Sequence, residues 1–396
     1  MTLQVSQNTR AKVSVSPTSK VFRGGRLSLR SQLTLIEKMK NHSQAAHIAA
    51  AFLAVFSVQG AFAADSSSGS SVTLYGVVDT NVRVSTHENA SGGSKTQMDA
   101  GGPITGSRWG LRMKEDLGGG LSAFSILESG FDTGTGQLLQ GGRAFGRQSL
   151  IGLQGAWGQV TAGRQYTVAH EMAASYEALG IANNSLLGFQ SGYTNLRQDN
   201  LLRYAGNFGP VSLIAGWTFG EQAGSGQKGA TKALAAAYKN GPLRIGGTLQ
   251  RSNNVSTYLG TAVAESREDF YSLGGTYDIQ KTKLLFSFNR HRLDNAGYAN
   301  NAVTVGMNMP VSERVTLIGT AMVDRMQHAQ GSGKRMVAGG VLEYALSKSA
   351  TLYGVIDYTR LSGEWMNVAT QPGFATPFYG NDNTRLGLGL GARVRF

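Results

Sequence analysis

The sequence predicts an all-β protein, a sixteen-stranded antiparallel β-barrel that spans a membrane. Three observations support this prediction. About sixteen segments alternate apolar with polar residues, short turns alternate with long polar connections, and an apolar stretch near the N-terminus resembles an export signal. A strand that crosses a bilayer at a tilt needs about ten residues, and its two faces then meet lipid and water.

An export signal precedes the predicted barrel. Lys40 supplies a short basic region, an apolar stretch covers residues 48–58, and Ala61-Phe62-Ala63 has the small residues that flank a secretory cleavage site. The apolar stretch, about eleven residues long, is too short for a membrane-spanning helix, which needs about twenty. We therefore interpret residues 39–63 as a cleaved secretory signal peptide and residues 64–396 as the exported barrel.

Residues 1–38 precede a complete signal, are basic and show no periodicity. We interpret them as a misassigned upstream extension, with Met39 as the true start. An unusually long signal peptide is the alternative. Residues 1–63 hold eight Lys and Arg and one Glu, a net charge of 8 − 1 = +7, so the formal charge of +13 falls to +6 for residues 64–396.

Composition and charge narrow the possible functions. The chain has no cysteine, which excludes disulfides and thiolate metal ligands. The exported part is only mildly basic and contains no basic helix or RNA-binding aromatic motif, so we expect no nucleic-acid partner. We also expect no cofactor and no resident metal ion.

Period-two alternation dominates residues 64–396. In the C-terminal stretch R-L-G-L-G-L-G-A-R-V-R-F, large apolar residues alternate with glycine and arginine. Strands are expected at 72–84, 106–116, 120–131, 143–154, 157–166, 199–208, 210–220, 232–240, 242–251, 269–278, 281–290, 302–308, 314–324, 335–346, 349–360 and 384–396.

The connections between these strands alternate in length. Short turns carry the Gly, Pro and Asn that tight turns require. Long polar connections are expected at 85–105, 132–142, 167–198, 221–231, 252–268, 291–301, 325–334 and 361–383. Short turns on one side of a membrane and long loops on the other are typical of transmembrane barrels, and this pattern places both termini on the short-turn side.

A soluble sandwich is the competing architecture. It would bury the apolar faces of its strands, whereas a membrane barrel turns them toward lipid and its polar faces toward a water-filled lumen. The export signal, the Gly, Thr, Arg and Asp of the polar faces, and the aromatic residues near strand ends favour the barrel. A closed barrel also pairs every backbone group, so the last strand should pair with the first.

Several stretches together resemble the general porins of the Gram-negative outer membrane, which are trimers of sixteen-stranded barrels. These stretches are S-V-T-L-Y-G-V-V-D, S-R-W-G-L-R-M-K-E-D-L-G-G-G-L, F-G-R-Q-S-L-I-G-L, G-Q-V-T-A-G-R-Q-Y and the terminal Phe396. The resemblance covers residues 70–396. It implies an outer-membrane pore for passive diffusion of small hydrophilic solutes and ions.

The resemblance also implies partners. They are the outer-membrane lipid, two further copies of the chain in a homotrimer, and the outer-membrane assembly machinery. Phe396 would be part of the signal that this machinery reads, a role compatible with an ordinary interfacial aromatic residue.

The resemblance further implies where solutes are selected. The connection after the fifth strand, at 167–198, would fold into the lumen and narrow it, although it lacks the P-E-F-G turn common in the family. It carries Glu171 and Glu177. The arginines that would face it, matched by motif, are Arg108 in S-R-W-G, Arg147 in F-G-R-Q, Arg164 in A-G-R-Q-Y and Arg203 in L-L-R-Y.

Alternation gives a separate indication of which arginines point inward. Arg108 lies on the face opposite Trp109, and Arg203 is likewise flanked by apolar residues, so both are predicted to face the lumen. Arg147 and Arg164 share parity with apolar residues, and their orientation stays open. The alternative for each arginine is a solvated position at the rim. An arginine-lined constriction predicts weak anion selectivity that decreases as salt screens the charges.

Three other functions remain possible: a substrate-specific outer-membrane channel, a barrel enzyme, and an adhesin or structural barrel. The histidines of the exported part, His87, His170, His291 and His328, lie in or beside predicted loops, and none belongs to an H-E-x-x-H or G-x-S-x-G motif. We therefore expect no enzymatic activity. His170-Glu171 is the one pair worth testing for a metal.

Overall fold

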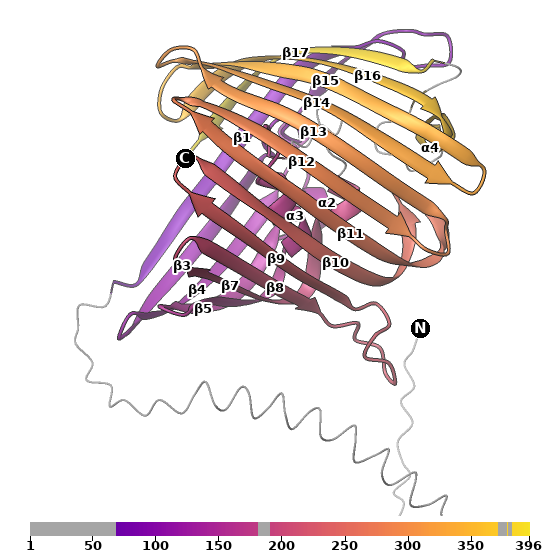
Figure 1. The fold of residues 1–396 in the computed structure, drawn as a ribbon. Coiled ribbons are helices and arrows are strands. Elements are labelled where there is room, and N and C mark those ends of the chain that lie inside the picture. Colours follow the sequence, from indigo (N-terminus) through magenta and orange to yellow (C-terminus); the bar gives the residue numbers. More distant parts are fainter. Residues whose placement is uncertain (1–68, 181–190, 371–377, 379–381) are drawn as a thin grey trace, which may run out of the picture. The chain divides into compact units, whose positions relative to one another are not determined.

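The computed structural model describes residues 69–180, 191–370, 378 and 382–396, so the predicted signal peptide and the extension before it lie outside the described residues. The described chain is mostly strand (Figure 1). The strands are β1 (Ser71–Ser85), β2 (Lys95–Asp99), β3 (Arg108–Gly118), β4 (Leu121–Gly130), β5 (Gln148–Gly155), β6 (Gly158–Tyr166), β7 (Arg197–Phe208), β8 (Val211–Thr218), β9 (Thr231–Asn240), β10 (Leu243–Tyr258), β11 (Thr261–Ile279), β12 (Thr282–Leu293), β13 (Tyr298–Pro310), β14 (Val315–His328), β15 (Gly331–Ala345), β16 (Ala350–Gly363) and β17 (Thr384–Arg395). Short helical segments are α2 (Leu139–Gly142), α3 (Val168–Ala174), η2 (Ser191–Thr194) and α4 (Glu364–Ala369).

The strands form one sheet that closes on itself, and each pair of hydrogen-bonded neighbours is antiparallel. β1 completes the ring, because its first half pairs with β3 on one edge and its second half pairs with β17 on the other. The short β2 pairs only with Asn81–Ser85 of β1, on the edge that β3 leaves free. Without β2, the 17-stranded sheet is the predicted barrel of 17 − 1 = 16 long strands. β2 was not predicted.

Several predicted loops prove to be paired strands. Polar residues in 252–268, 291–301 and 325–334 continue β10 to β15, and these segments turn within a few residues. Leu259 and Gly260 alone separate β10 from β11, with φ of 50° and 92°, values that a type I′ hairpin turn requires. Beyond the lipid the outward side chains become polar, but the backbone N–H and C=O groups still need partners, so the ladder continues.

The two faces of each strand have the polarity expected of a membrane barrel. In β12, Leu284, Phe286 and Phe288 are exposed on the outside, while the alternating residues Ser287 and Asn289 are buried. The terminal strand β17 follows the same rule: its leucines are exposed, and Arg385 and Arg393 are buried. The outward-facing apolar side chains form what we call the apolar band.

The inward-facing glycines of β17 let side chains from both neighbouring strands meet above it. Arg83 of β1 extends over Gly387 and binds Asp357 of β16 at both ends, with Nη1–Oδ2 at 2.6 Å and Nη2–Oδ1 at 2.8 Å. A Cβ atom at Gly387 would overlap the Arg83 guanidinium. Glycine at this position is therefore needed for a close approach, as glycines within strands often are.

A second bridge crosses β17 near its other end. The Tyr353 hydroxyl of β16 donates to Asp79 Oδ1 of β1 at 2.6 Å, and it passes over Gly391. These two residues belong to the similar stretches T-L-Y-G-V-I-D and T-L-Y-G-V-V-D, which begin at Thr351 and Thr73. Both stretches flank the strand that closes the barrel.

Phe396 completes the closure. Its backbone N–H donates to the Gly76 carbonyl at 3.1 Å, and its carbonyl accepts from the Gly76 N–H at 2.9 Å. The ring lies over Gly76, where any Cβ atom would overlap it. The Phe396 side chain remains 59% exposed, so it lies on the outer surface at the short-turn end.

An apolar cluster joins the helical segments to the barrel wall. We call it the loop-end cluster; it comprises Ala169, Ala173, Tyr193, Tyr258, Phe270, Leu293, Tyr298, Ala302, Met322, Met326, Val337, Leu361, Trp365, Val368, Ala369 and Phe378. Its wall residues come from β10 to β16, and the others come from α3, η2, α4 and Phe378. Within the described ranges, no helix is long and apolar enough to cross a membrane.

Candidate functional site

A cavity of about 770 Å³ lies beside the inner faces of β1 and β3 to β7, and its walls are rich in arginine. Arg108 and Arg147 both bind Glu128 of β4: Arg108 Nε lies 3.4 Å from Oε2 and Arg147 Nε lies 2.8 Å from Oε1. The Tyr75 hydroxyl also donates to Glu128 Oε2, at 2.9 Å. Glu128 thus fixes two guanidinium groups against the wall.

Tyr166, the last residue of β6, connects two arginines of the same cavity. Its hydroxyl accepts from Arg147 Nη2 and from Arg197 Nη2, each at 2.7 Å. The Arg197 guanidinium lies 4.4 Å from the centre of the Tyr166 ring, a cation–π arrangement. The His170 ring stacks on Tyr166 with its centre 5.1 Å away.

His170 lies in the segment that follows β6, outside the spanning strands. Burial, together with the nearby charges of Arg197 and Arg147, lowers its pKa to about 3. The imidazole is therefore neutral at any pH at which the barrel works. Its ring stacks on Tyr166 and adds no positive charge to the cavity.

The described residues of the segment between β6 and β7 pack on inward-facing side chains of the barrel. Thr167 caps α3 by accepting from the His170 N–H at 3.1 Å, which satisfies one free donor of the first turn. On the opposite side of α3, Met172 and Tyr176 contact Ala235 and other small residues of β9. Small wall residues leave room for the helix to lie close to the sheet.

Glu177 attaches the end of this segment to the wall. Its Oε1 accepts from the Ser287 hydroxyl of β12 at 2.6 Å, and the side chain is buried. Burial raises the pKa of Glu177 to about 7, although the Ser287 and Thr304 hydroxyls oppose this shift. The carboxyl group is therefore largely neutral in mildly acidic solution.

Glu171 of α3 occupies a different position from Glu177. Its Oε2 lies 2.7 Å from Arg203 Nη2 of β7, and half of the carboxylate side chain is exposed. Glu171 lines the first cavity and also a second cavity of about 510 Å³, which is lined by Arg203 and Arg244. A carboxylate therefore stands where the two cavities adjoin.

The arginines and acids predicted from the sequence divide into two groups. Arg108, Arg147 and Glu171 line the first cavity, and Arg203 lines the second. Arg164 lines neither: it donates to the Gly146 carbonyl and pairs with Asp199 at 2.6 Å. Glu177 also lines neither and anchors the segment.

The strand pairing next to Arg164 is irregular. The pairing of β6 with β7 shifts register between Gly163 and Gln165, and Gly163 has a φ of +128°. Gln165 is buried on the inner side, and its side chain donates to the Leu201 carbonyl at 2.9 Å. Arg164 thus lies on the other face of the strand, the one that parity assigned to its apolar neighbours.

Several cavity residues were not chosen from the sequence. Arg112 has the same parity as Arg108 and could have been chosen by that rule. Glu128 is on the inner face of β4 and was missed because the family motifs do not include it. Arg197 and Tyr166 lie at strand ends, where alternation gives little information.

The charge of the first cavity is positive. Four guanidinium groups, of Arg108, Arg112, Arg147 and Arg197, stand against the carboxylates of Glu128 and Glu171, which leaves a net charge of 4 − 2 = +2. Arginine keeps its charge at any working pH, and a cleft with low-dielectric walls strengthens the resulting field. Among the described residues, no group of three or more His, Asp or Glu side chains is arranged to bind a metal ion.

A closed barrel with an apolar exterior and a charged, cavity-containing interior defines the class of membrane channels. Comparison with known proteins identifies the family. The model of the Gram-negative porin family matches residues 49–364. The chain therefore belongs to the Gram-negative porins, and it is an outer-membrane pore for the passive diffusion of small hydrophilic solutes.

Individual relatives agree with this assignment. The chain is 31% identical to outer membrane porin protein 32 of Delftia acidovorans over 325 residues, covering 78% of this chain and 88% of that protein. It is 29% identical to an outer membrane porin protein of Bordetella pertussis over 369 residues, covering 79% and 93%. Among solved structures, an anion-selective porin from Comamonas acidovorans superposes with a TM-score of 0.71 at 26% identity, covering 83% of this chain and 100% of that one.

Proposed function

We propose that this porin is weakly anion-selective and that arginines of β3 and β7, together with Arg147 just before β5, form its selectivity filter. The observation that carries the proposal is the net positive charge of the first cavity. Arg108 and Arg147 share the carboxylate of Glu128. Among the described residues, Arg112 and Arg197 form no ion pair with a carboxylate. An anion entering this cavity gains Coulomb energy that a cation loses. The resemblance to an anion-selective porin supports the same sign.

We propose further that Glu171 limits this preference. Its carboxylate adjoins both cavities and neutralises Arg203. The passage would therefore be narrowest between Glu171 and the arginines of the wall. The segment after β6 then acts as the constriction element, with Glu177 as its anchor on β12. A field directed from the arginines toward Glu171 would orient dipolar solutes as they pass.

Planar-bilayer recording tests the filter. In a tenfold KCl gradient we expect a zero-current potential of the sign given by chloride preference, which shrinks in a variant with Arg108→Gln and Arg112→Gln. The matched control is Arg164→Gln, because Arg164 is an arginine of the same wall that lines neither cavity. Cation preference in the unmodified protein, or an equal shift in the control, would contradict the proposal.

The remaining proposals follow the relatives. We propose that the mature protein is a homotrimer, that residues 39–63 are removed on export, and that the assembly machinery reads Phe396. The exposure of the Phe396 ring at the short-turn end supports the last point. We also propose that the chain has no enzymatic activity, since its relatives are named as porins.

A further inference from the structure

Two connections of the barrel meet at one buried carboxylate, that of Asp324 on the inner face of β14. The segment between β6 and β7 brings Tyr193 of η2 to it, and the Tyr193 hydroxyl donates to Asp324 Oδ2 at 2.7 Å. The Asn300 amide of β13 donates to Asp324 Oδ1 at 3.2 Å. Each oxygen of this carboxylate therefore accepts from a neutral donor, and one donor belongs to a connection rather than to the wall.

The second connection reaches Asp324 through Arg335. Arg335 lies directly opposite Asp324 in the β14–β15 ladder, so the two buried side chains share the inner face and their charges compensate. The Arg335 guanidinium also lies over the ring of Trp365, 5.9 Å from its centre, a cation–π arrangement. Trp365 is a buried residue of α4, the helix that begins the connection between β16 and β17 at the loop end (Figure 1).

A further contact fixes the end of the segment between β6 and β7. The Asn195 amide donates to Glu268 Oε2 of β11, and His291 Nε2 lies 2.8 Å from Glu268 Oε1. The His291 ring stacks on the Tyr193 ring with its centre 4.5 Å away. The wall therefore contacts Tyr193 twice, at its ring and at its hydroxyl. The hydroxyl contact is the one that involves α4, because Asp324 also faces Arg335.

Polar contacts determine how these connections pack. Tyr193 and Trp365 both belong to the loop-end cluster, together with Ala169 and Ala173 of α3. Apolar burial is non-directional and would permit several arrangements of the two connections. A buried carboxylate that loses a donor costs free energy, so Asp324 favours the arrangement in which Tyr193 is docked. Arg335 likewise favours the position of α4 that keeps the Trp365 ring beneath it.

We propose that Asp324 is a positioning residue of the passage, through which the connection between β16 and β17 controls the constriction. The proposal rests on the proposed function, in which the segment after β6 narrows the lumen. Tyr193 fixes the C-terminal end of that segment, and Arg335 links the position of α4 to the same carboxylate. Long connections face the cell exterior in barrels of this kind. A displacement of α4 from outside therefore loosens the constriction inside.

Thiol labelling tests the anchor. The chain has no cysteine, so Ala173→Cys introduces a single reporter. Ala173 is buried in the loop-end cluster, so a water-soluble methanethiosulfonate reagent reacts there only when the segment opens. Tyr193→Phe removes a hydrogen bond to a charged group, which corresponds to a factor of roughly ten to a hundred in the opening equilibrium. Labelling should accelerate by that factor. Ala169→Cys serves as the reporter if Ala173→Cys does not fold.

Tyr353→Phe is the matched control for Tyr193→Phe. It also removes a buried tyrosine hydroxyl that donates to an aspartate, since Tyr353 bonds to Asp79 at 2.6 Å. That hydrogen bond joins β16 to β1 at the seam and does not involve the segment between β6 and β7. The control should therefore leave the labelling rate of the reporter almost unchanged, even if it lowers the stability of the barrel.

Variants of α4 test the link between the two connections. Trp365→Leu removes the ring beneath Arg335 and should accelerate labelling several-fold, whereas Trp365→Phe keeps an aromatic face and should restore most of the protection. Asn367→Ala, on the exposed side of α4, is the control and should have no effect. In a Tyr193→Phe background Trp365→Leu should add little, because interacting residues have non-additive effects.

Single-channel recording of the same variants completes the test, with increased open-channel current noise expected in Tyr193→Phe and Trp365→Leu. The proposal fails if Tyr193→Phe labels at the unmodified rate, or if Tyr353→Phe accelerates labelling equally. It also fails if Trp365→Leu leaves labelling unchanged, or if faster labelling brings no change in noise. None of these readouts depends on anion preference, so unchanged selectivity in the Arg108→Gln and Arg112→Gln variant would contradict the filter alone.

Discussion

Replacing Gly387 by alanine should open the seam at which the barrel closes. Gly387 lies beneath the Arg83–Asp357 pair, which joins β1 to β16 across β17. The two side chains are 3% and 0% exposed, and both hydrogen bonds are short. A Cβ atom at residue 387 would occupy the space of the guanidinium, so Arg83 must move away from Asp357.

The cost follows from the burial of this pair. Separating the partners of a buried ion pair costs about 3–5 kcal/mol, since each charge is left without a partner. Replacing glycine by alanine recovers about 0.4–1 kcal/mol through the smaller entropy of the unfolded chain. The net loss of stability should therefore be about 2–4.6 kcal/mol.

Urea unfolding in lipid vesicles, followed by tryptophan fluorescence, measures this loss. Gly319→Ala is the matched control, because it lies in β14 and a Cβ atom there meets nothing within 4 Å. It should change the free energy of unfolding by less than about 1 kcal/mol. In an Asp357→Asn background the pair is already weakened, so Gly387→Ala should cost much less than it does alone.

Two results would refute this reasoning. Gly387→Ala could unfold at the same urea concentration as the unmodified protein, which would mean that Arg83 finds an equivalent partner. Alternatively, its effect could be equally large in the Asp357→Asn background. The glycine would then serve the backbone of β17, and the ion pair would be incidental.

Three further predictions concern the passage. The pKa of Glu177 is about 7, against an ordinary value of 4.5. The packing of the segment that carries Glu177 is therefore most stable below about pH 4.5, and it loses up to about 3 kcal/mol as the pH rises through 7. Current noise should increase over that range, and Glu177→Gln should abolish the increase. Glu171→Gln should increase chloride preference in a salt-gradient recording, because it removes the carboxylate that pairs with Arg203. Anion preference should also fall between 0.1 M and 1 M salt, as the Debye length shortens from about 10 Å to about 3 Å, and a preference that is independent of salt would mean that size alone selects.

The sequence predicted the barrel and its strand faces well because lipid imposes a simple rule. Each residue of a spanning strand contacts either hydrocarbon or the interior, so β17 shows a clean alternation of leucine with glycine and arginine. The same rule correctly oriented Arg108 toward the cavity. It also required the last strand to meet the first, and Phe396 does pair with Gly76.

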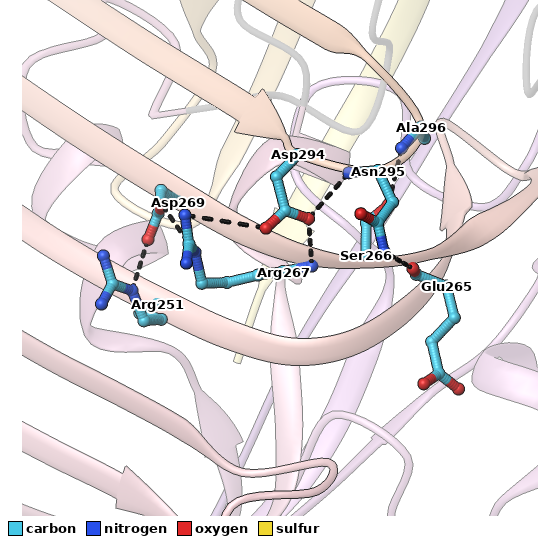
Figure 2. A network of polar contacts seen from close by, with 8 residues as sticks. All are labelled: Arg251, Glu265, Ser266, Arg267, Asp269, Asp294, Asn295 and Ala296. Carbon is cyan, nitrogen blue, oxygen red and sulfur yellow. Dashed lines mark hydrogen bonds and ion pairs between the residues drawn. The ribbon is translucent and has the colours of Figure 1, made fainter.

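The alternation of lipid-facing and interior-facing residues does not hold for strand residues that lie beyond the lipid. Between Arg251 and Asp269, the exposed residues of β10 and β11 include Glu265 and Arg267 (Figure 2), so polarity suggested a loop at 252–268 where the structure has a hairpin. Arg147 precedes β5, and its contact with Glu128 depends on the bend before the strand. Parity cannot describe such residues, because their orientation is set by tertiary hydrogen bonds.

The interior of this barrel is chemically divided, and the division bears on how solutes pass. Apolar side chains of β10 to β16 are covered by α3, η2 and α4 in the loop-end cluster, so that part of the wall presents no charge to water. The arginines lie on β3, β7 and the start of β5, and Glu171 faces them from α3. In the proposed function, solutes pass along the arginine wall, where low-dielectric surroundings make each charge more effective.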